Sequence, residues 1–175
     1  MSDDFRSLLA AVSFAARAHD GQRRKDGKTP YVAHVMRVAL IVRHKFGFDD
    51  PEMLEAALLH DTMEDTTTDF DDVAQSFSPA VASWAAALSK DKRLPEEARE
   101  KAYVAVLRNA PWQVQVCKLA DVYDNTIDSA HLDAKGRTRT LTRMRMYLTA
   151  LSDSAHSEVQ RCWKIVDELV TSVGG

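Results

Sequence analysis

Residues 56–65 read AALLHDTMED, an apolar run that leads directly into a cluster of ionisable side chains. We expect one helix here that begins at Pro51, because the preceding Asp is a good N-cap and Pro suits the first helical position. This helix is predicted to continue through His60 and Asp61. His60 and Glu64 are then four positions apart and project to the same side. Buried ionisable groups need a partner or a metal, whereas the alternative, a solvated acidic helix end, is disfavoured by the helix dipole.

The rest of the chain shows further helical patterns around this stretch. Apolar residues recur at helical spacing, and proline after a capping residue marks several helix starts. Helices are expected at residues 5–20, 31–46, 51–65, 69–77, 79–89, 95–110, 112–125, 135–152 and 155–172. The sequence contains no clear strand alternation, internal repeat or long linker. The predicted fold class is therefore all-α, a single-domain helical bundle over residues 1–175.

Two other helical segments carry candidate partners for the central stretch. His34 lies beside an apolar stripe, and Asp121 ends another mostly apolar stretch. Each alone is more typical of a core histidine or a helix-end carboxylate. Together, His34, His60, Asp61 and Asp121 supply two imidazoles and two carboxylates, which suit a divalent metal with open positions for water and substrate. This order on a helical chain resembles the signature of the HD phosphohydrolase superfamily.

A closer resemblance rests on longer segments. AARAH at residues 15–19, QRRKD at 22–26 and TPYVAH at 29–34 precede the central stretch, and KLAD follows it at 118–121. These segments resemble the small alarmone hydrolases, the stand-alone relatives of the hydrolase domain of RelA/SpoT proteins, over about residues 14–147. The resemblance implies an all-helical HD-type domain that binds one Mn²⁺ ion. It also implies hydrolysis of guanosine 3′-diphosphate 5′-(di/tri)phosphate, (p)ppGpp, to GDP or GTP and pyrophosphate.

The resemblance further implies roles for individual residues. The metal ligands it implies are His34, His60, Asp61 and Asp121. The residues that activate or position the attacking water are Glu64 and Asp65. The contacts to the phosphates, base or ribose of the substrate are Arg24, Lys25, Lys92, Asn125, Arg143 and Tyr147.

The third segment departs from the family pattern. Val122 and Ile127 stand where the family usually has cations, and Asp124 and Asp128 add two acids nearby. We expect these two acids to face the substrate, repel its phosphates and raise KM. Replacing Asp128 with Thr is accordingly expected to improve KM.

These departures leave two alternatives open. One is another phosphohydrolase activity, such as removal of the 2′-phosphate of NADPH. The other is a non-catalytic nucleotide-binding regulatory module, which the intact Glu64 and Asp65 disfavour.

The composition excludes several other classes of protein. The formal net charge of −3 argues against a general nucleic-acid coat protein. The longest uncharged run, residues 73–89, is too polar to span a bilayer. The acidic start is followed by no apolar signal core, and the two cysteines, Cys117 and Cys162, form no C-x-x-C pair and fit a reducing cytosol. We expect a cytoplasmic protein with a nucleotide substrate and no nucleic-acid or membrane partner, of undetermined oligomeric state.

Overall fold

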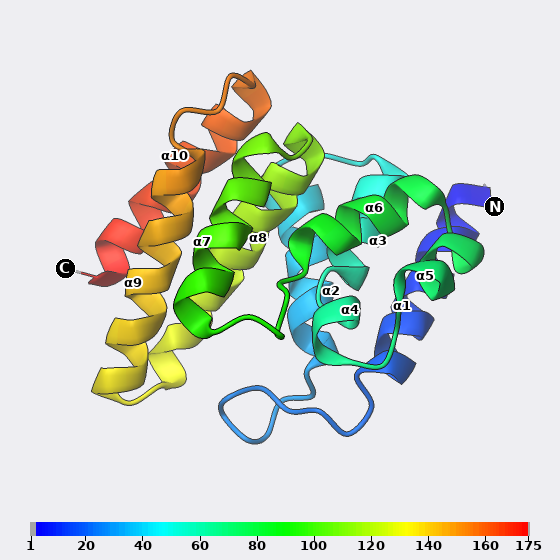
Figure 1. Cartoon of the computed structure of the whole chain (residues 1–175), viewed down its shortest axis with the longest axis horizontal. Coiled ribbons are helices and arrows are strands. Elements are labelled where there is room, and N and C mark those ends of the chain that lie inside the picture. Colours follow the sequence, from blue (N-terminus) through cyan, green and yellow to red (C-terminus); the bar gives the residue numbers. More distant parts are fainter. Residues whose placement is uncertain (1–2, 175) are drawn as a thin grey trace.

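The computed structural model describes residues 3–174, and Met1 and Ser2 of the acidic start lie outside this range (Figure 1). Its helices, in chain order, are α1 (Asp3–Ala18), α2 (Val32–Leu40), the π-helical η1 (Ile41–Lys45), α3 (Pro51–Leu59), α4 (Thr62–Asp65), α5 (Phe70–Ser76), α6 (Pro79–Leu88), α7 (Glu96–Asn109), α8 (Trp112–Asp128), the 3₁₀-helical η2 (Ser129–His131), α9 (Ala134–Leu151) and α10 (Ser157–Gly174). Between residues 3 and 174 the only β-type pairing is an isolated bridge of Arg23 with Pro30. The all-α prediction is confirmed.

Two helices form the centre of the bundle. Every residue of α3 from Met53 to Leu59 is buried, and so is every residue of α8 from Val114 to Val122. Burial of each large apolar side chain contributes about 1.5–3 kcal/mol, so these two segments are firmly held. His60 directly follows the first segment and Asp121 lies within the second. Two candidate ligands are therefore held by the most buried parts of the fold.

Most helix starts follow the capping signals in the sequence. The side chain of Asp50 accepts a hydrogen bond from the backbone of Met53 at 3.1 Å, and Pro51 occupies the first turn of α3. Ser78 caps α6 in the same way, through the backbone of Val81 at 3.1 Å. These side chains satisfy amide groups that have no partner within the helix, which explains why α3 and α6 begin where predicted.

The predicted continuous helix through His60 and Asp61 is wrong. α3 ends at Leu59, the next two residues form a turn, and α4 starts at Thr62. The hydroxyl of Thr62 donates to the carbonyl oxygen of Leu59 at 2.7 Å. A side-chain hydrogen bond of this kind competes with the backbone hydrogen bonds of a helix. The helix breaks at the two residues that the sequence marks for chemistry.

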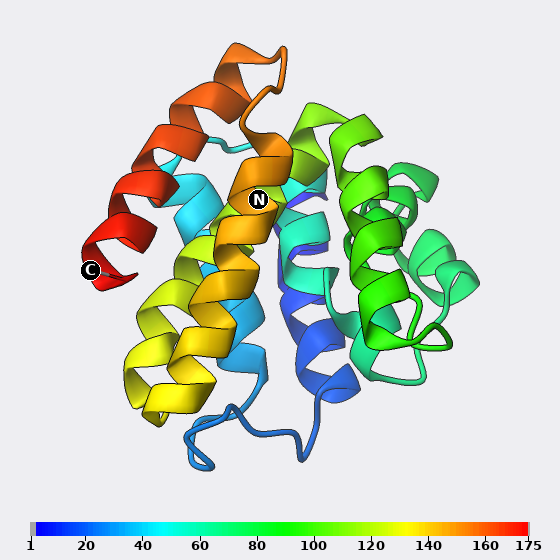
Figure 2. The same cartoon turned by 60° about the vertical axis from the view of Figure 1, so that its left-hand side comes forward.

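Three connecting segments gather at one end of the bundle. They are the loop between α1 and α2, the loop between α6 and α7, and the turn from α8 to α9 (Figures 1 and 2). The first two loops supply residues to a cavity that is also lined by α4, α8 and α9. None of the helices within residues 3–174 is both long and apolar enough to cross a membrane.

Candidate active site

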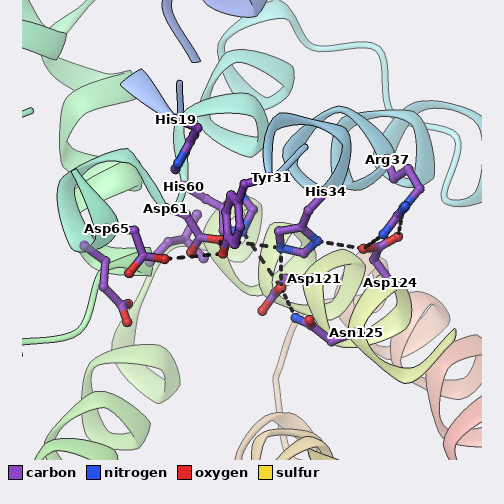
Figure 3. Close-up of polar contacts among 12 residues, drawn as sticks. His19, Tyr31, His34, Arg37, His60, Asp61, Asp65, Asp121, Asp124 and Asn125 are labelled. Atoms are coloured by element: carbon purple, nitrogen blue, oxygen red, sulfur yellow. Dashed lines mark hydrogen bonds and ion pairs between the residues drawn. The ribbon is translucent and has the colours of Figure 1, made fainter. Parts of the chain in front are cut away.

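The four predicted metal ligands lie together. His34 comes from α2, His60 and Asp61 from the turn between α3 and α4, and Asp121 from α8 (Figure 3). The Nε2 atom of His34 lies 3.5 Å from Oδ2 of Asp61 and 3.2 Å from Oδ1 of Asp121. The Nε2 atom of His60 lies 3.1 Å and 3.9 Å from the same two oxygens. One ligand atom each of His34, His60 and Asp121 falls within 4.8 Å of the others, which is close enough to share one ion.

The two imidazoles make their hydrogen bonds to Ala57 and Asp124 through Nδ1, so that both Nε2 atoms face Asp61 and Asp121. Nδ1 of His60 donates to the carbonyl oxygen of Ala57 at 2.7 Å, and Nδ1 of His34 donates to Oδ2 of Asp124 at 2.6 Å. Each neutral imidazole therefore carries its lone pair on Nε2. Nε2 of His60 is buried and makes no hydrogen bond to any residue in the range 3–174. An unpartnered buried nitrogen is costly, and a divalent metal would satisfy it, so these residues fit the implied ion.

The charges of the site also favour a cation. Burial by itself lowers the pKa of His34, but the carboxylates of Asp121, Asp124 and Asp61 raise it to about 10. Burial also acts to lower the pKa of His60, but the neighbouring carboxylate of Asp61 raises it overall. The same carboxylates that favour protons on the two imidazoles would favour a divalent ion in place of those protons.

Tyr31 connects one of the predicted metal ligands with the predicted catalytic pair. Its hydroxyl donates to Oδ2 of Asp61 at 2.6 Å and lies 3.3 Å from Oδ2 of Asp65. Burial and the nearby carboxylates raise the pKa of Tyr31, so the phenol remains a hydrogen-bond donor. The sequence analysis gave Tyr31 no role, although it lies in the TPYVAH segment. The sequence does not indicate that its hydroxyl reaches Asp61 and Asp65, because these acids lie 30 and 34 positions further along the chain.

Lys118 is a second residue whose role the sequence did not reveal. Its ammonium lies 2.7 Å from Oδ2 of Asp121 and 4.1 Å from the ring centroid of Tyr147, and the side chain is buried. The only available signal was a lysine at the end of an apolar stretch, three positions before an acid. Lys118 balances part of the negative charge of Asp121 while leaving its other oxygen directed at the imidazoles.

Replacing Lys118 with Met is expected to lower the free energy of unfolding of the metal-free protein by about 3 kcal/mol, because Asp121 would stay buried without its nearest cation. Urea unfolding in the presence of a chelator measures this change. The matched control is Lys101→Met on the exposed side of α7, which should shift the free energy by under about 0.5 kcal/mol. Equal stabilities of the two variants would contradict the assigned role of Lys118.

The predicted catalytic carboxylates lie on α4 at the edge of the cavity. Oε2 of Glu64 accepts a hydrogen bond from the backbone of Lys90 at 2.9 Å, and the Lys90 ammonium lies 3.8 Å from its other oxygen. Burial raises the pKa of Glu64, and Lys90 opposes this effect. Asp65 pairs with Tyr31 and with the ammonium of Lys92. A partly buried carboxylate with a raised pKa is suited to accept a proton from water.

Cations line the cavity opposite these carboxylates. The positively charged lining residues are Arg23, Arg24, Lys25, Lys90, Lys118 and Arg143. Arg24 is buried and donates from Nη2 to Oδ1 of Asn125 at 3.0 Å. Nδ2 of Asn125 in turn donates to Oδ1 of Asp121 at 2.5 Å. Partial burial, then Arg24 and Arg143, lower the pKa of Lys25. This crowding of positive charge suits a polyphosphate.

Like Arg24 and Asn125, three further predicted substrate contacts already have protein partners. Lys92 is exposed, pairs with Asp65 and is not among the cavity-lining residues. Arg143 lines the cavity, but its Nη2 lies 2.6 Å from Oε1 of Glu96. The buried hydroxyl of Tyr147 donates to Oε2 of Glu100 at 2.5 Å. A substrate would have to displace these partners, so direct contacts from these three residues remain predictions.

The prediction that Asp124 and Asp128 face the substrate is wrong. Asp124 is buried and accepts from Nδ1 of His34 and from Arg37, whose Nε lies 2.6 Å from Oδ1. Asp128 accepts from Nε of Arg24 at 3.0 Å and from Nη2 of Arg37 at 3.3 Å. Neither acid lines the cavity. Arginines neutralise both carboxylates. The structure therefore does not support the expected repulsion of phosphates or the expected improvement of KM by Asp128→Thr.

Comparisons with known proteins agree with this geometry. Residues 11–153 match the HD domain family. A relative from Xenopus tropicalis, named guanosine-3′,5′-bis(diphosphate) 3′-pyrophosphohydrolase MESH1, is 38% identical over 137 residues, which cover 78% of this chain and 76% of the relative. The Homo sapiens protein of the same name is 40% identical over 129 residues, with coverage of 73% and 72%.

A solved structure extends the similarity to almost the whole chain. It is described as a metazoan ortholog of SpoT that hydrolyses ppGpp and plays a role in starvation responses. It superposes with a TM-score of 0.84 at 28% identity and covers 96% of each chain. The chain therefore belongs to the HD domain family and, within it, to the group of the MESH1-type pyrophosphohydrolases.

Proposed function

We propose that this protein hydrolyses (p)ppGpp at its 3′-diphosphate, producing GDP or GTP and pyrophosphate. The observation that carries the proposal is the arrangement of His34 and His60 against Asp61 and Asp121, beside a cavity that several cationic side chains line. The membership of the MESH1 group supports the same reaction and substrate. Glu64 supplies the carboxylate that a hydrolytic enzyme needs and that a pure binding module does not, which disfavours the regulatory alternative.

The proposed reaction assigns a task to each group of residues. A bound divalent ion supplies a Lewis acid for the phosphoryl group and for the attacking water. Glu64 accepts the proton of this water as its oxygen bonds to the phosphorus attached to the ribose 3′ oxygen. The bond from that phosphorus to the 3′ oxygen breaks, and the 3′ oxygen takes up a proton from solvent water. Arg24 and Lys25 offset the charge of the departing pyrophosphate, Arg24 with a planar fork and Lys25 as a point charge.

We further propose that the ion is Mn²⁺. Two imidazole nitrogens and two carboxylates form a mixed nitrogen and oxygen donor set, and Mn²⁺ accepts both donor types. His34, His60, Asp61 and Asp121 would hold one ion, with the remaining positions open to water and substrate. Asp65, which Tyr31 connects to Asp61, would position the water rather than bind the ion.

The proposed setting is a single HD-type domain over residues 1–175 that acts in the cytoplasm on a guanosine nucleotide. Cys117 and Cys162 are buried free thiols, as is common where thiols are kept reduced. Six cationic side chains line the cavity of a chain whose net charge is −3. This distribution supports a small anionic substrate over a nucleic acid.

A parallel assay of two substrates tests the proposed function. Values of kcat/KM for ppGpp and for NADPH should be measured with Mn²⁺ and with a chelator. The proposal predicts Mn²⁺-dependent cleavage of ppGpp that is at least ~10-fold more efficient than release of phosphate from NADPH, a difference of about 1.4 kcal/mol in transition-state stabilisation. Cleavage of NADPH with ppGpp left intact would overturn the substrate assignment and keep the HD phosphohydrolase class.

A further inference from the structure

Asp124 is the polar residue that lies directly behind His34. Its Oδ2 accepts from Nδ1 of His34 at 2.6 Å, on the side of the ring that faces away from Asp61 and Asp121 (Figure 3). Arg37, one turn further along α2, donates two hydrogen bonds to the same carboxylate, from Nε to Oδ1 at 2.6 Å and from Nη2 to Oδ2 at 3.0 Å. The carboxylate of Asp124 is therefore fixed at both oxygens.

A contribution to the stability of the fold does not by itself explain why the carboxylate of Asp124 is buried. Asp124 is 2% exposed, whereas the side chain of Arg37 is 38% exposed. Burying a carboxylate costs several kcal/mol, and a buried ion pair is often no more stabilising than well-packed apolar residues. The pair lies outside the cavity, so contact with substrate cannot explain it either. Among the predicted metal ligands, Asp124 hydrogen-bonds only to His34 within residues 3–174, and Nη2 of Arg24 lies farther from its Oδ2, at 3.9 Å.

We propose that Asp124, held in place by Arg37, is a positioning residue that fixes His34 as a metal ligand. By accepting a hydrogen bond from Nδ1–H, the carboxylate favours the tautomer in which Nε2 carries the lone pair. By its negative charge, it makes the imidazole a stronger donor to a cation. His60 receives only the first of these effects, because its Nδ1 proton goes to the neutral carbonyl of Ala57. The inference rests on the metal site proposed above.

The test is calorimetric titration of Mn²⁺ into the metal-free protein and its variants. Asp124→Asn keeps an acceptor oxygen but loses the charge, and it is expected to weaken Mn²⁺ binding about 10-fold. Asp124→Leu loses both and is expected to weaken it about 100-fold. Thermal unfolding of each metal-free variant shows that it is folded. Calorimetry measures Mn²⁺ affinity directly, so the result depends on neither substrate nor enzymatic activity.

Asp128→Asn is the matched control. Asp128 lies one turn further along α8 and also accepts from Arg37, but it does not contact His34. The control removes the same charge from the same helix, so it is expected to change Mn²⁺ affinity less than threefold. Equal losses in Asp124→Asn and Asp128→Asn would show a general charge effect and overturn the inference, as would an unchanged affinity in folded Asp124→Leu.

A measurement on the unaltered protein covers the case in which both Asp124 variants fail to fold. With Zn²⁺ as a diamagnetic probe, nitrogen-15 NMR of the histidines should place the remaining proton of His34 on Nδ1. Its resonance should lie downfield of the His60 proton, because its acceptor is charged. A His34 proton on Nε2 would overturn the inference. Failure of the unaltered protein to bind Mn²⁺ or Zn²⁺ would instead overturn the proposed metal centre itself.

Discussion

Replacing His60 with Ala is expected to weaken Mn²⁺ binding by more than ~100-fold and to abolish hydrolysis. Loss of a residue that only supports a ligand already costs about 10–100-fold, and His60 is itself a proposed ligand. Its Nε2 lies 3.1 Å from Oδ2 of Asp61, so removing the imidazole takes away one of the two nitrogen donors of the proposed ligand set. Elemental analysis after dialysis measures the bound metal, and far-UV circular dichroism measures the helical content, which should persist.

The control for this variant is His44→Ala. His44 is an exposed histidine of η1 and lies outside the cavity. It should retain the metal and the activity of the unaltered protein. Undiminished metal content in His60→Ala would contradict the assignment of His60 as a ligand.

Replacing Glu64 with Gln is expected to lower kcat by roughly 10²–10⁴-fold, the range of a well-placed general base. The amide is nearly the same size and still accepts the hydrogen bond from Lys90, but it cannot take a proton from water. Metal content should be unchanged, because Glu64 contacts none of the proposed ligands through a hydrogen bond or ion pair within residues 3–174. Steady-state kinetics with parallel metal analysis separates the two effects.

Glu97→Gln, on the exposed first turn of α7, is the matched control and should leave kcat unaltered. Asp65→Asn is expected to retain metal and lose turnover in the same way as Glu64→Gln. A double amide variant at positions 64 and 65 whose rate stays within about threefold of the unaltered protein, under ~0.7 kcal/mol of barrier, would rule out a catalytic role for the pair.

The helices could be predicted from the sequence where local capping decides them. Asp50 and Ser78 cap α3 and α6 as their positions before proline indicate. The break at His60 could not be predicted, because it depends on the hydroxyl of Thr62 taking the carbonyl of Leu59. Threonine at that position is equally compatible with an uninterrupted helix. Periodicity therefore located the helical segment and missed the turn that directs its ligands.

The functional residues divide in a similar way. The order His34, His60, Asp61, Asp121 was readable because the residue types and their helical setting are specific. The partners of these ligands were not readable, because each contact joins helices that are distant in sequence. Arg37 and Asp124 are 87 positions apart, and no spacing rule indicates that they meet. For this reason Asp124 was first interpreted as a charge that repels substrate.

Product analysis of ppGpp hydrolysis in oxygen-18-labelled water, with Mn²⁺ present, tests the central claim most directly. Attack of water on the phosphorus attached to the ribose 3′ oxygen predicts GDP and pyrophosphate as products, with the label in pyrophosphate and none in GDP. Release of inorganic phosphate with a nucleoside 3′-monophosphate, or label in GDP, would contradict the proposed reaction. So would Mn²⁺-loaded protein that leaves ppGpp intact.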